Sequence, residues 1–117
     1  MELQEVKLIE DEWSVTFEGI KEWADSGAVH MLHVKTTDVG GINRVVEGIV
    51  YCRSKGVGAY LGGTCNETDK AARVCAHVAL ATGPDQMLAK PGMAVDEGLM
   101  IVFNEMQRTL AIVRTRT

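Results

Sequence analysis

Short apolar runs and longer amphipathic segments alternate along the chain. Four apolar runs have the length of buried strands, and they lie at residues 6–9, 29–35, 57–61 and 86–89. Each run is followed by a segment whose apolar residues recur at intervals of three and four, which predicts helices at 16–26, 42–55, 68–81 and from Asp96 onward. Gly27, Gly56 and Gly83 stand where the first three helices are expected to end.

The same spacing indicates which residues of the helices are buried. We expect these to point inward: Ile42, Val45, Val46, Ile49 and Val50, then Ala71, Val74, Cys75 and Val78, then Leu99, Ile101, Val102, Met106 and Leu110. The run at 6–9 is expected to be a buried strand that opens onto the acidic residues after it.

A strand followed by a helix, four times over, predicts an α/β fold. Such βα repeats form a parallel sheet with helices packed on it. Four units make either a small open α/β sheet or half of an eight-unit (β/α)8 barrel. In both architectures, functional residues collect at the carboxyl ends of the strands. Polar residues follow all four predicted strands: Asp11 and Glu12, Lys35, Thr64 to Asn66, and Lys90.

Composition and charge narrow the class of protein. The chain has 117 residues, 46% hydrophobic and 24% charged, as in an ordinary soluble domain. The net charge is −4 without a cluster of Lys and Arg, so neither nucleic acid nor a membrane surface is an expected partner. No run is long enough to span a bilayer, and no signal peptide opens the sequence. Three cysteines without CxxC spacing indicate no disulfide framework or zinc site, so a cytoplasmic setting is expected.

Two residues at neighbouring strand ends point to acid–base chemistry beside a metal. Asp11 could give a carboxylate to a hard cation such as Mg²⁺. Lys35, partly desolvated near a cation, would lose proton affinity and act as a general base. The alternatives are an N-cap or solvated turn for Asp11 and a strand-end lysine with its ammonium in solvent for Lys35. His33 is expected on the same face as Lys35, as a ligand, a relay or a satisfied interior histidine.

The segment 62–67 joins the third strand to the third helix. Its two glycines free the backbone, and polar side chains follow at the helix N-terminus, where an anion could be held. A plain structural turn is the alternative. Cys65 has no histidine near it in sequence, which favours binding or packing over a nucleophilic role.

Six motifs follow one another along nearly the whole chain. They are EDEW at 10–13, HMLHVKT at 30–36, DVGG at 38–41, GGTCNET at 62–68, AKPGM at 89–93 and DEG at 96–98. In this order they closely resemble the methylaspartate ammonia-lyase family of the enolase superfamily. The resemblance covers only the C-terminal part of such an enzyme. It implies that residues 1–117 are a single domain, units five to eight of the barrel, without the N-terminal capping domain and the first barrel half.

The resemblance implies a reaction and a role for several residues. The reaction is Mg²⁺-assisted removal of the proton next to a carboxylate of (2S,3S)-3-methylaspartate, a small amino dicarboxylic acid, with loss of ammonia to give mesaconate. By this resemblance, Asp11 matches one of three Mg²⁺ ligands and Lys35 matches the base. Thr64 and Cys65 match residues that hold a substrate carboxylate, and Leu88 matches a residue in the wall of the substrate pocket. His33 stands where the family usually has a glutamine that contacts substrate.

The resemblance also implies an incomplete site in this chain. The other two metal carboxylates lie upstream in the family, and a half-barrel leaves two open sheet edges. We therefore expect the chain to self-associate as a homo-oligomer or to complement a missing N-terminal half. A truncated, non-catalytic half-barrel is the alternative to an ammonia-lyase.

Overall fold

Strands and helices alternate through the computed structural model, which describes residues 6–63, 68–88 and 94–116. In these residues the elements are β1 Ile9–Glu10, α1 Phe17–Ser26, β2 Met31–Lys35, α2 Ile42–Ser54, β3 Gly58–Gly62, α3 Asp69–Thr82, β4 Gln86–Met87 and α4 Val95–Arg114. All eight predicted elements are confirmed in type and order, and the strands are mostly shorter than the sequence indicated.

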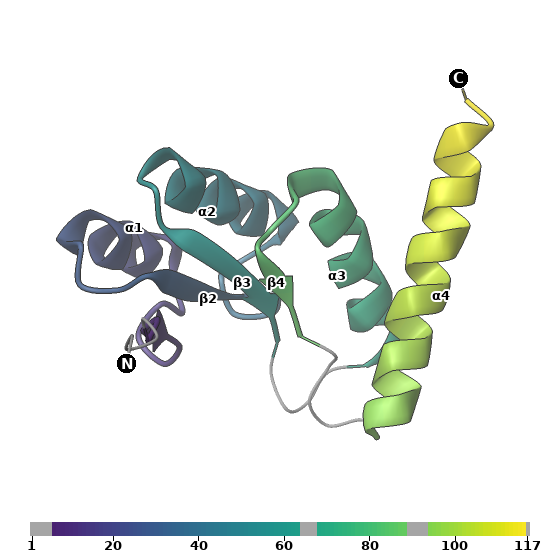
Figure 1. The fold of residues 1–117 in the computed structure, drawn as a ribbon, viewed down its shortest axis with the longest axis horizontal. Helices are drawn as coiled ribbons and strands as arrows, with labels where there is room; N and C mark the ends of the chain where they lie inside the picture. Colours follow the sequence, from purple (N-terminus) through teal and green to yellow (C-terminus); the bar gives the residue numbers. More distant parts are fainter. Residues whose placement is uncertain (1–5, 64–67, 89–93, 117) are drawn as a thin grey trace, which may run out of the picture.

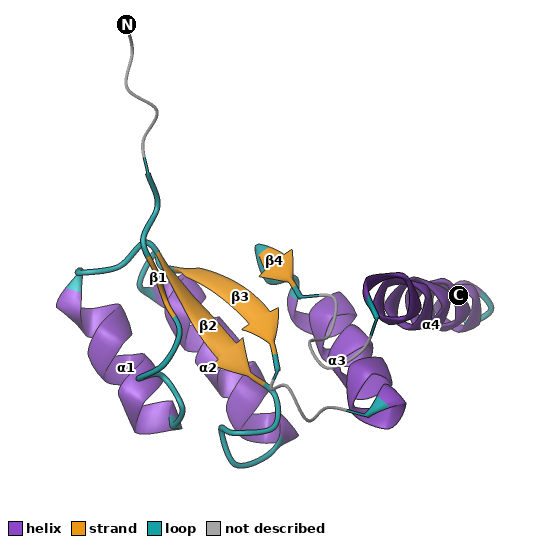
Figure 2. Ribbon diagram, turned by 90° about the horizontal axis from the view of Figure 1, so that it is seen from below, coloured by secondary structure: helices purple, strands orange, loops and turns teal. Residues whose placement is uncertain are grey.

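The four strands form one parallel sheet in the order β1-β2-β3-β4. Figure 1 shows β2, β3 and β4 side by side, and Figure 2 shows β1 beside β2 and α1, α2 and α3 on the same side of the sheet. Sequential order with helices on one face is the arrangement of a βα barrel. A doubly wound sheet instead reverses its strand order and is covered on both faces. The fold is therefore half of a barrel rather than a small open sheet.

Alternation along the strands separates the core from the functional face. Leu32, Val34, Ala59 and Leu61 are at most 3% exposed and face the helices. The residues between them point to the opposite face, which is the inner face of the half-barrel: Met31, His33, Lys35, Tyr60 and Gly62. The hydrophobic core thus lies between sheet and helices, and the candidate site lies on the other side of the same strands.

The prediction of a buried strand at 6–9 is wrong. β1 begins only at Ile9, and the exposed fractions of Val6, Leu8 and Ile9 are 77%, 56% and 46%. The reason is that β1 is an edge strand with a single neighbour, β2, so much of its apolar surface has no cover within the described residues.

The inward-facing prediction for α2 is partly wrong. Val45 and Ile49 are buried, but Ile42 and Val50 are 54% and 52% exposed. The buried face of α2 is completed instead by Gly48 and Cys52. Val50 is exposed because it lies on another side of the helix than this buried face. Ile42 is exposed in the first turn of the helix. The expected face of α3 is confirmed, since Cys75 and Val78 are buried and the other two residues are half-buried.

Helix α4 packs on α3, and Figure 1 shows it apart from the sheet. Ile101, Val102, Met106 and Leu110 are half-buried, as predicted for an inward face. Leu99 is 52% exposed, which contradicts the prediction, because one neighbouring helix covers only part of a broad apolar face. Even so, no helix in the described part of the chain is long and apolar enough to cross a membrane.

A buried carboxylate joins α4 to α3. The Glu105 side chain is 7% exposed, and it accepts hydrogen bonds from Arg108 at 2.6 Å and contacts His77 Nε2 at 2.7 Å. Hydrogen bonds from Arg108 and then His77 lower the pKa of Glu105 from 4.5 to about 2, although burial opposes the shift. The charged carboxylate is therefore stabilised in the folded chain.

We expect a Glu105→Gln variant to lose a pH-dependent part of the stability. Because the pKa of Glu105 is lower folded than unfolded, its contribution is fully present above about pH 5 and disappears as the pH falls toward 2. The free energies of unfolding of the parent and Glu105→Gln should thus differ at pH 6 and converge at low pH. Urea unfolding across this range measures the difference. A gap that stays constant with pH would contradict the prediction, and Glu97→Gln on the same helix is the control.

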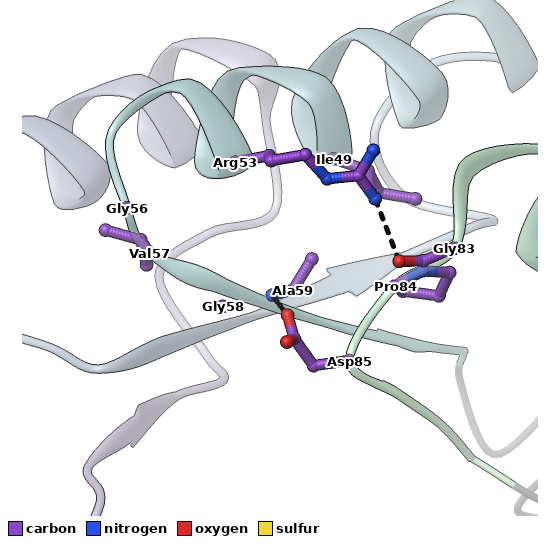
Figure 3. Close-up of a pocket in the computed structure, with 9 residues that line it drawn as sticks. All are labelled: Ile49, Arg53, Gly56, Val57, Gly58, Ala59, Gly83, Pro84 and Asp85. Carbon is purple, nitrogen blue, oxygen red and sulfur yellow. Dashed lines mark hydrogen bonds between the residues drawn. The ribbon is translucent and has the colours of Figure 1, made fainter.

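A small cleft lies at the amino ends of the strands, opposite to the site edge. Figure 3 shows it between α2, the start of β3 and the segment before β4. Arg53 donates hydrogen bonds to the carbonyl oxygens of Thr82 and, at 2.8 Å, of Gly83 at the C-terminus of α3. Asp85 Oδ2 accepts from the Ala59 N–H at 2.9 Å. These side chains satisfy backbone groups, so the cleft stabilises the fold, as expected for this end of a barrel.

Replacing Arg53 with methionine should destabilise the protein by about 1–2 kcal/mol, because two carbonyls at the end of α3 lose a charged donor. Methionine keeps most of the aliphatic stem, so the change isolates the hydrogen bonds. Arg73→Met is the matched control, since Arg73 pairs with Asp69 at 3.8 Å on the exposed surface of α3 and its replacement should cost less than ~0.5 kcal/mol. Chemical denaturation measures both. Equal values for the two variants would contradict the assignment.

Candidate functional site

Three predicted site residues converge where β1 and β2 end. Asp11 follows β1 directly, and Lys35 is the last residue of β2. Lys35 Nζ lies 3.1 Å from Asp11 Oδ1 and 3.8 Å from Glu12 Oε1. Asp11 Oδ1 also contacts His33 Nδ1. The Asp11 side chain is half exposed, whereas those of Lys35 and His33 are 12% and 7% exposed. The structure therefore brings a carboxylate, an ammonium and an imidazole together.

Hydrogen bonds fix the loop that carries Asp11. Glu10 Oε1 accepts from the Trp13 N–H at 2.5 Å, which closes a turn around Asp11 and Glu12. The buried hydroxyl of Ser14 donates to the His33 carbonyl at 3.0 Å and so ties this loop to β2. Thr16 then caps α1 by accepting from the Gly19 N–H. The position of Asp11 is thus set by its neighbours in the loop and by β2.

The imidazole of His33 is held on several sides. Its ring stacks on that of Tyr60 in β3, with centroids 4.7 Å apart and an angle of 24° between the planes. Nδ1 contacts Asp11, and a Cβ placed on Gly62 would lie only 1.8 Å from Nε2. His33 is 5% exposed, and its Nε2 is buried without a hydrogen-bond partner in the described part of the chain. The ring can occupy this position only because residue 62 is glycine.

The charges of Asp11 and Lys35 stabilise each other. Burial alone would raise the pKa of Asp11, but hydrogen bonds from His33 and Lys35 lower it overall. Burial alone would lower the pKa of Lys35, but Asp11, and then Glu12 and Asp38, raise it overall. Burial thus acts on the pKa of Lys35 in the direction expected from the sequence, and the neighbouring carboxylates outweigh it.

The remaining predicted site residues belong to the third and fourth strand ends. Leu88 follows β4, and its N–H donates to the Leu61 carbonyl at 2.8 Å. Leu88 therefore lies beside the end of β3. At the same edge, Thr36 donates to the Gly62 carbonyl from its N–H at 3.1 Å and its hydroxyl at 3.0 Å. Thr64, Cys65 and Lys90 lie outside the described residues. The ends of β2, β3 and β4 are thus held in register.

Sequence reasoning missed three residues that build this site. Ser14 and Tyr60 position His33, and Gly62 leaves room for its ring. The signal for Gly62 was present, since a glycine at a strand end often marks a close approach. The contact between His33 and Asp11 gave no signal in the sequence.

A hard cation fits the chemistry of this edge only in part. Asp11 offers a half-exposed carboxylate with Glu12 beside it, and carboxylate oxygens are the ligands that Mg²⁺ prefers. Within residues 6–63, 68–88 and 94–116, no group of three or more His, Cys, Asp or Glu residues could hold a metal ion. The described part of the chain therefore supplies one strong candidate ligand, not a complete site.

Comparisons with known proteins find relatives along nearly the whole chain. A family model described as methylaspartate ammonia-lyase C-terminus matches residues 1–115. Methylaspartate ammonia-lyase 2 of Carboxydothermus hydrogenoformans is 61% identical over 111 residues, which cover 95% of this chain and 27% of the relative. The chain spans about a quarter of the length of the curated relatives it matches.

Solved structures give the same result. The crystal structure of Citrobacter amalonaticus methylaspartate ammonia lyase containing (2S,3S)-3-methylaspartic acid has a TM-score of 0.89 and 53% identity, covering 93% of this chain and 26% of that one. The Mg-complex of β-methylaspartase from Clostridium tetanomorphum has a TM-score of 0.89 and 51% identity, covering 96% and 27%. A muconate cycloisomerase variant shares the fold alone, at a TM-score of 0.61 and 22% identity over 70% of this chain and 22% of that one. Since the family model spans nearly all of its residues, the chain belongs to the methylaspartate ammonia-lyase family and corresponds to the C-terminal part of its members.

Proposed function

We propose that this chain is the C-terminal barrel half of a carbon–nitrogen lyase that converts (2S,3S)-3-methylaspartate to mesaconate and ammonia. The observation that carries the proposal is the pairing of Lys35 Nζ with Asp11 Oδ1, 3.1 Å apart at the carboxyl ends of adjacent strands. A titratable amine beside a carboxylate at this edge of a barrel is an arrangement typical of active sites. Family membership supplies the reaction class.

In the proposed reaction Lys35 acts as the base. Its Nζ takes the proton from C3, the carbon next to the distal carboxylate of the substrate. The electrons of the C–H bond form the C2=C3 double bond, and the C2–N bond breaks, so that nitrogen leaves with its electron pair as ammonia. Lys35 is 12% exposed and sits at the end of a buried strand, which keeps its amine in one place.

The proposal requires Lys35 to be neutral when it takes this proton. In the structure the Asp11 carboxylate raises the pKa of Lys35 and thus favours the ammonium form. A bound Mg²⁺ would compensate the charge of Asp11 and stabilise the negative charge that develops on the substrate carboxylate. Asp11 is the residue of this chain that would hold it, as one ligand of a larger set. Thr64 and Cys65 would hold a substrate carboxylate, and Leu88 would border the pocket.

We also propose that the site is completed by protein outside the matched quarter. One carboxylate is a poor Mg²⁺ site, because the ion then keeps most of its waters. The N-terminal capping domain and first barrel half of the family would supply the other ligands and cover the inner face. Isolated residues 1–117 should therefore show no turnover.

Mesaconate formation tests the proposal. In the complete polypeptide that carries this chain, we expect ultraviolet absorbance to report mesaconate from (2S,3S)-3-methylaspartate, with turnover abolished by a chelator and restored by Mg²⁺. A second arm mixes residues 1–117 with the first three quarters of the Carboxydothermus relative, which supplies the rest of the barrel. Folded protein that binds Mg²⁺ and makes no mesaconate in either arm would rule out the ammonia-lyase assignment.

A non-catalytic half-barrel that self-associates is the second candidate. The observation that favours it is exposed apolar surface in two places, Leu8 and Ile9 at the edge strand β1, and Leu99 and Phe103 on α4. Two copies could cover each other's surfaces as a homo-oligomer. Sedimentation of residues 1–117 tests self-association, and a folded monomer would contradict this second candidate. A stable dimer supports it only together with the absence of mesaconate in both arms of the test above.

A further inference from the structure

The proposed reaction assigns no step to His33, but three described residues confine its ring. Tyr60 covers one face, Gly62 lies against Nε2, and Asp11 lies against Nδ1. The exposed fraction of His33 is 5%. A ring enclosed in this way cannot turn to seek another partner, so its contact with Asp11 is fixed by the fold.

The chemistry of the contact determines which ring nitrogen carries a proton. An ionised carboxylate only accepts hydrogen bonds, so Nδ1 must donate to Asp11 Oδ1. Nε2 is buried and has no hydrogen-bond partner among the residues that the structure describes. Among the described residues, the imidazole therefore makes a hydrogen bond only through Nδ1. Its satisfied atom is the one that faces Asp11.

We propose that His33 is a positioning residue that orients the Asp11 carboxylate toward a divalent cation. The Nδ1–H of His33 holds Oδ1, and the stacking on Tyr60 and the glycine at position 62 hold the ring. A carboxylate held by a second group in this way loses less freedom when it binds a metal, and such groups change metal affinity by about 10–100-fold. The inference rests on the proposed function, because it takes Asp11 as a metal ligand.

Two variants of nearly equal shape test the role of the Nδ1 donor. In His33→Asn the side-chain amide lies near the former Nδ1 and can donate to Asp11, whereas His33→Leu has no donor. Both lose the ring, so a comparison between them cancels the loss of stacking. Titration of the complete polypeptide with Mn²⁺, followed by electron paramagnetic resonance, should give an affinity for His33→Asn at least ~10-fold higher than for His33→Leu and close to that of the parent. His33→Phe, which keeps an aromatic ring, replaces His33→Leu if the latter does not fold.

A second comparison locates the effect at Asp11. In an Asp11→Ala background, the difference in Mn²⁺ affinity between His33→Asn and His33→Leu should disappear, because the residue being positioned is gone. His77→Leu, a histidine change on α3 away from the site, should leave Mn²⁺ affinity unchanged. Equal affinities for the Asn and Leu variants would overturn the inference, as would a difference that survives in Asp11→Ala or a parent that binds no Mn²⁺. Normal Mn²⁺ binding without mesaconate formation would instead overturn the proposed function and leave the role of His33 standing.

Discussion

Replacing Lys35 with methionine is expected to reduce mesaconate formation from (2S,3S)-3-methylaspartate by about 10²–10⁴-fold, the usual contribution of a general base. Methionine has a similar length and fills a similar volume, so the 12% exposed position stays packed while the amine is lost. Turnover of the complete polypeptide at saturating Mg²⁺ gives the main measurement. Exchange of the C3 proton with deuterium from solvent gives a second one, and it should fall in parallel because it reports proton removal alone.

Lys35→Met should not weaken metal binding, although it should reduce turnover. Lys35 Nζ lies 3.1 Å from Asp11 Oδ1 and competes with any cation for that carboxylate. Mn²⁺ affinity of Lys35→Met should thus be unchanged or higher, which separates a lost base from a damaged site. Lys55→Met is the matched control, since Lys55 pairs with the surface residue Asp25 at 3.3 Å and should not affect turnover. Full activity of Lys35→Met on the (2S,3S) isomer would disprove its role as the base.

The secondary structure could be predicted because each element has its own local signal. The spacing of apolar residues in 42–55 and 68–81 fixed two helices within a residue or two of α2 and α3. The repeats alone could not predict the topology, because an open sheet and half a barrel contain the same βα units. Only the strand order and the one-sided placement of α1 to α3 distinguished them. Burial at β1 and at Leu99 of α4 was mispredicted because these apolar residues have few neighbours within the described chain.

The candidate site could be predicted only as a set of positions. Asp11 and Lys35 follow adjacent parallel strands, and the carboxyl ends of such strands lie at one edge, so their proximity followed from the pattern. The contact between His33 and Asp11 could not be predicted from the pattern, because it depends on the pairing register of the strands and on side-chain torsions. The raised pKa of Lys35 also required the structure, since burial and a nearby carboxylate shift it in opposite directions.

Gly62→Ala is expected to be the most damaging single-methyl change in the sheet. The new Cβ would lie 1.8 Å from His33 Nε2 and 2.8 Å from its Cδ2. Residue 62 has no left-handed backbone conformation, so the penalty comes from this clash and not from backbone strain. With Tyr60 and Asp11 against the ring, His33 cannot move aside without losing a contact. Overpacking of this kind costs about 1–3 kcal/mol, to be measured by chemical denaturation of the complete polypeptide.

A matched glycine and a double variant make this prediction specific. At Gly58, on the same strand and face, a Cβ would meet the flexible end of Met31 at 3.1 Å, so Gly58→Ala should cost clearly less. Removing the ring should relieve the clash at position 62. Adding Gly62→Ala to His33→Ala should therefore cost almost nothing further, whereas the same change in the parent costs the full amount. If Gly62→Ala were equally destabilising with and without the imidazole, the space at residue 62 would serve the strand itself and not the placement of His33 beside Asp11.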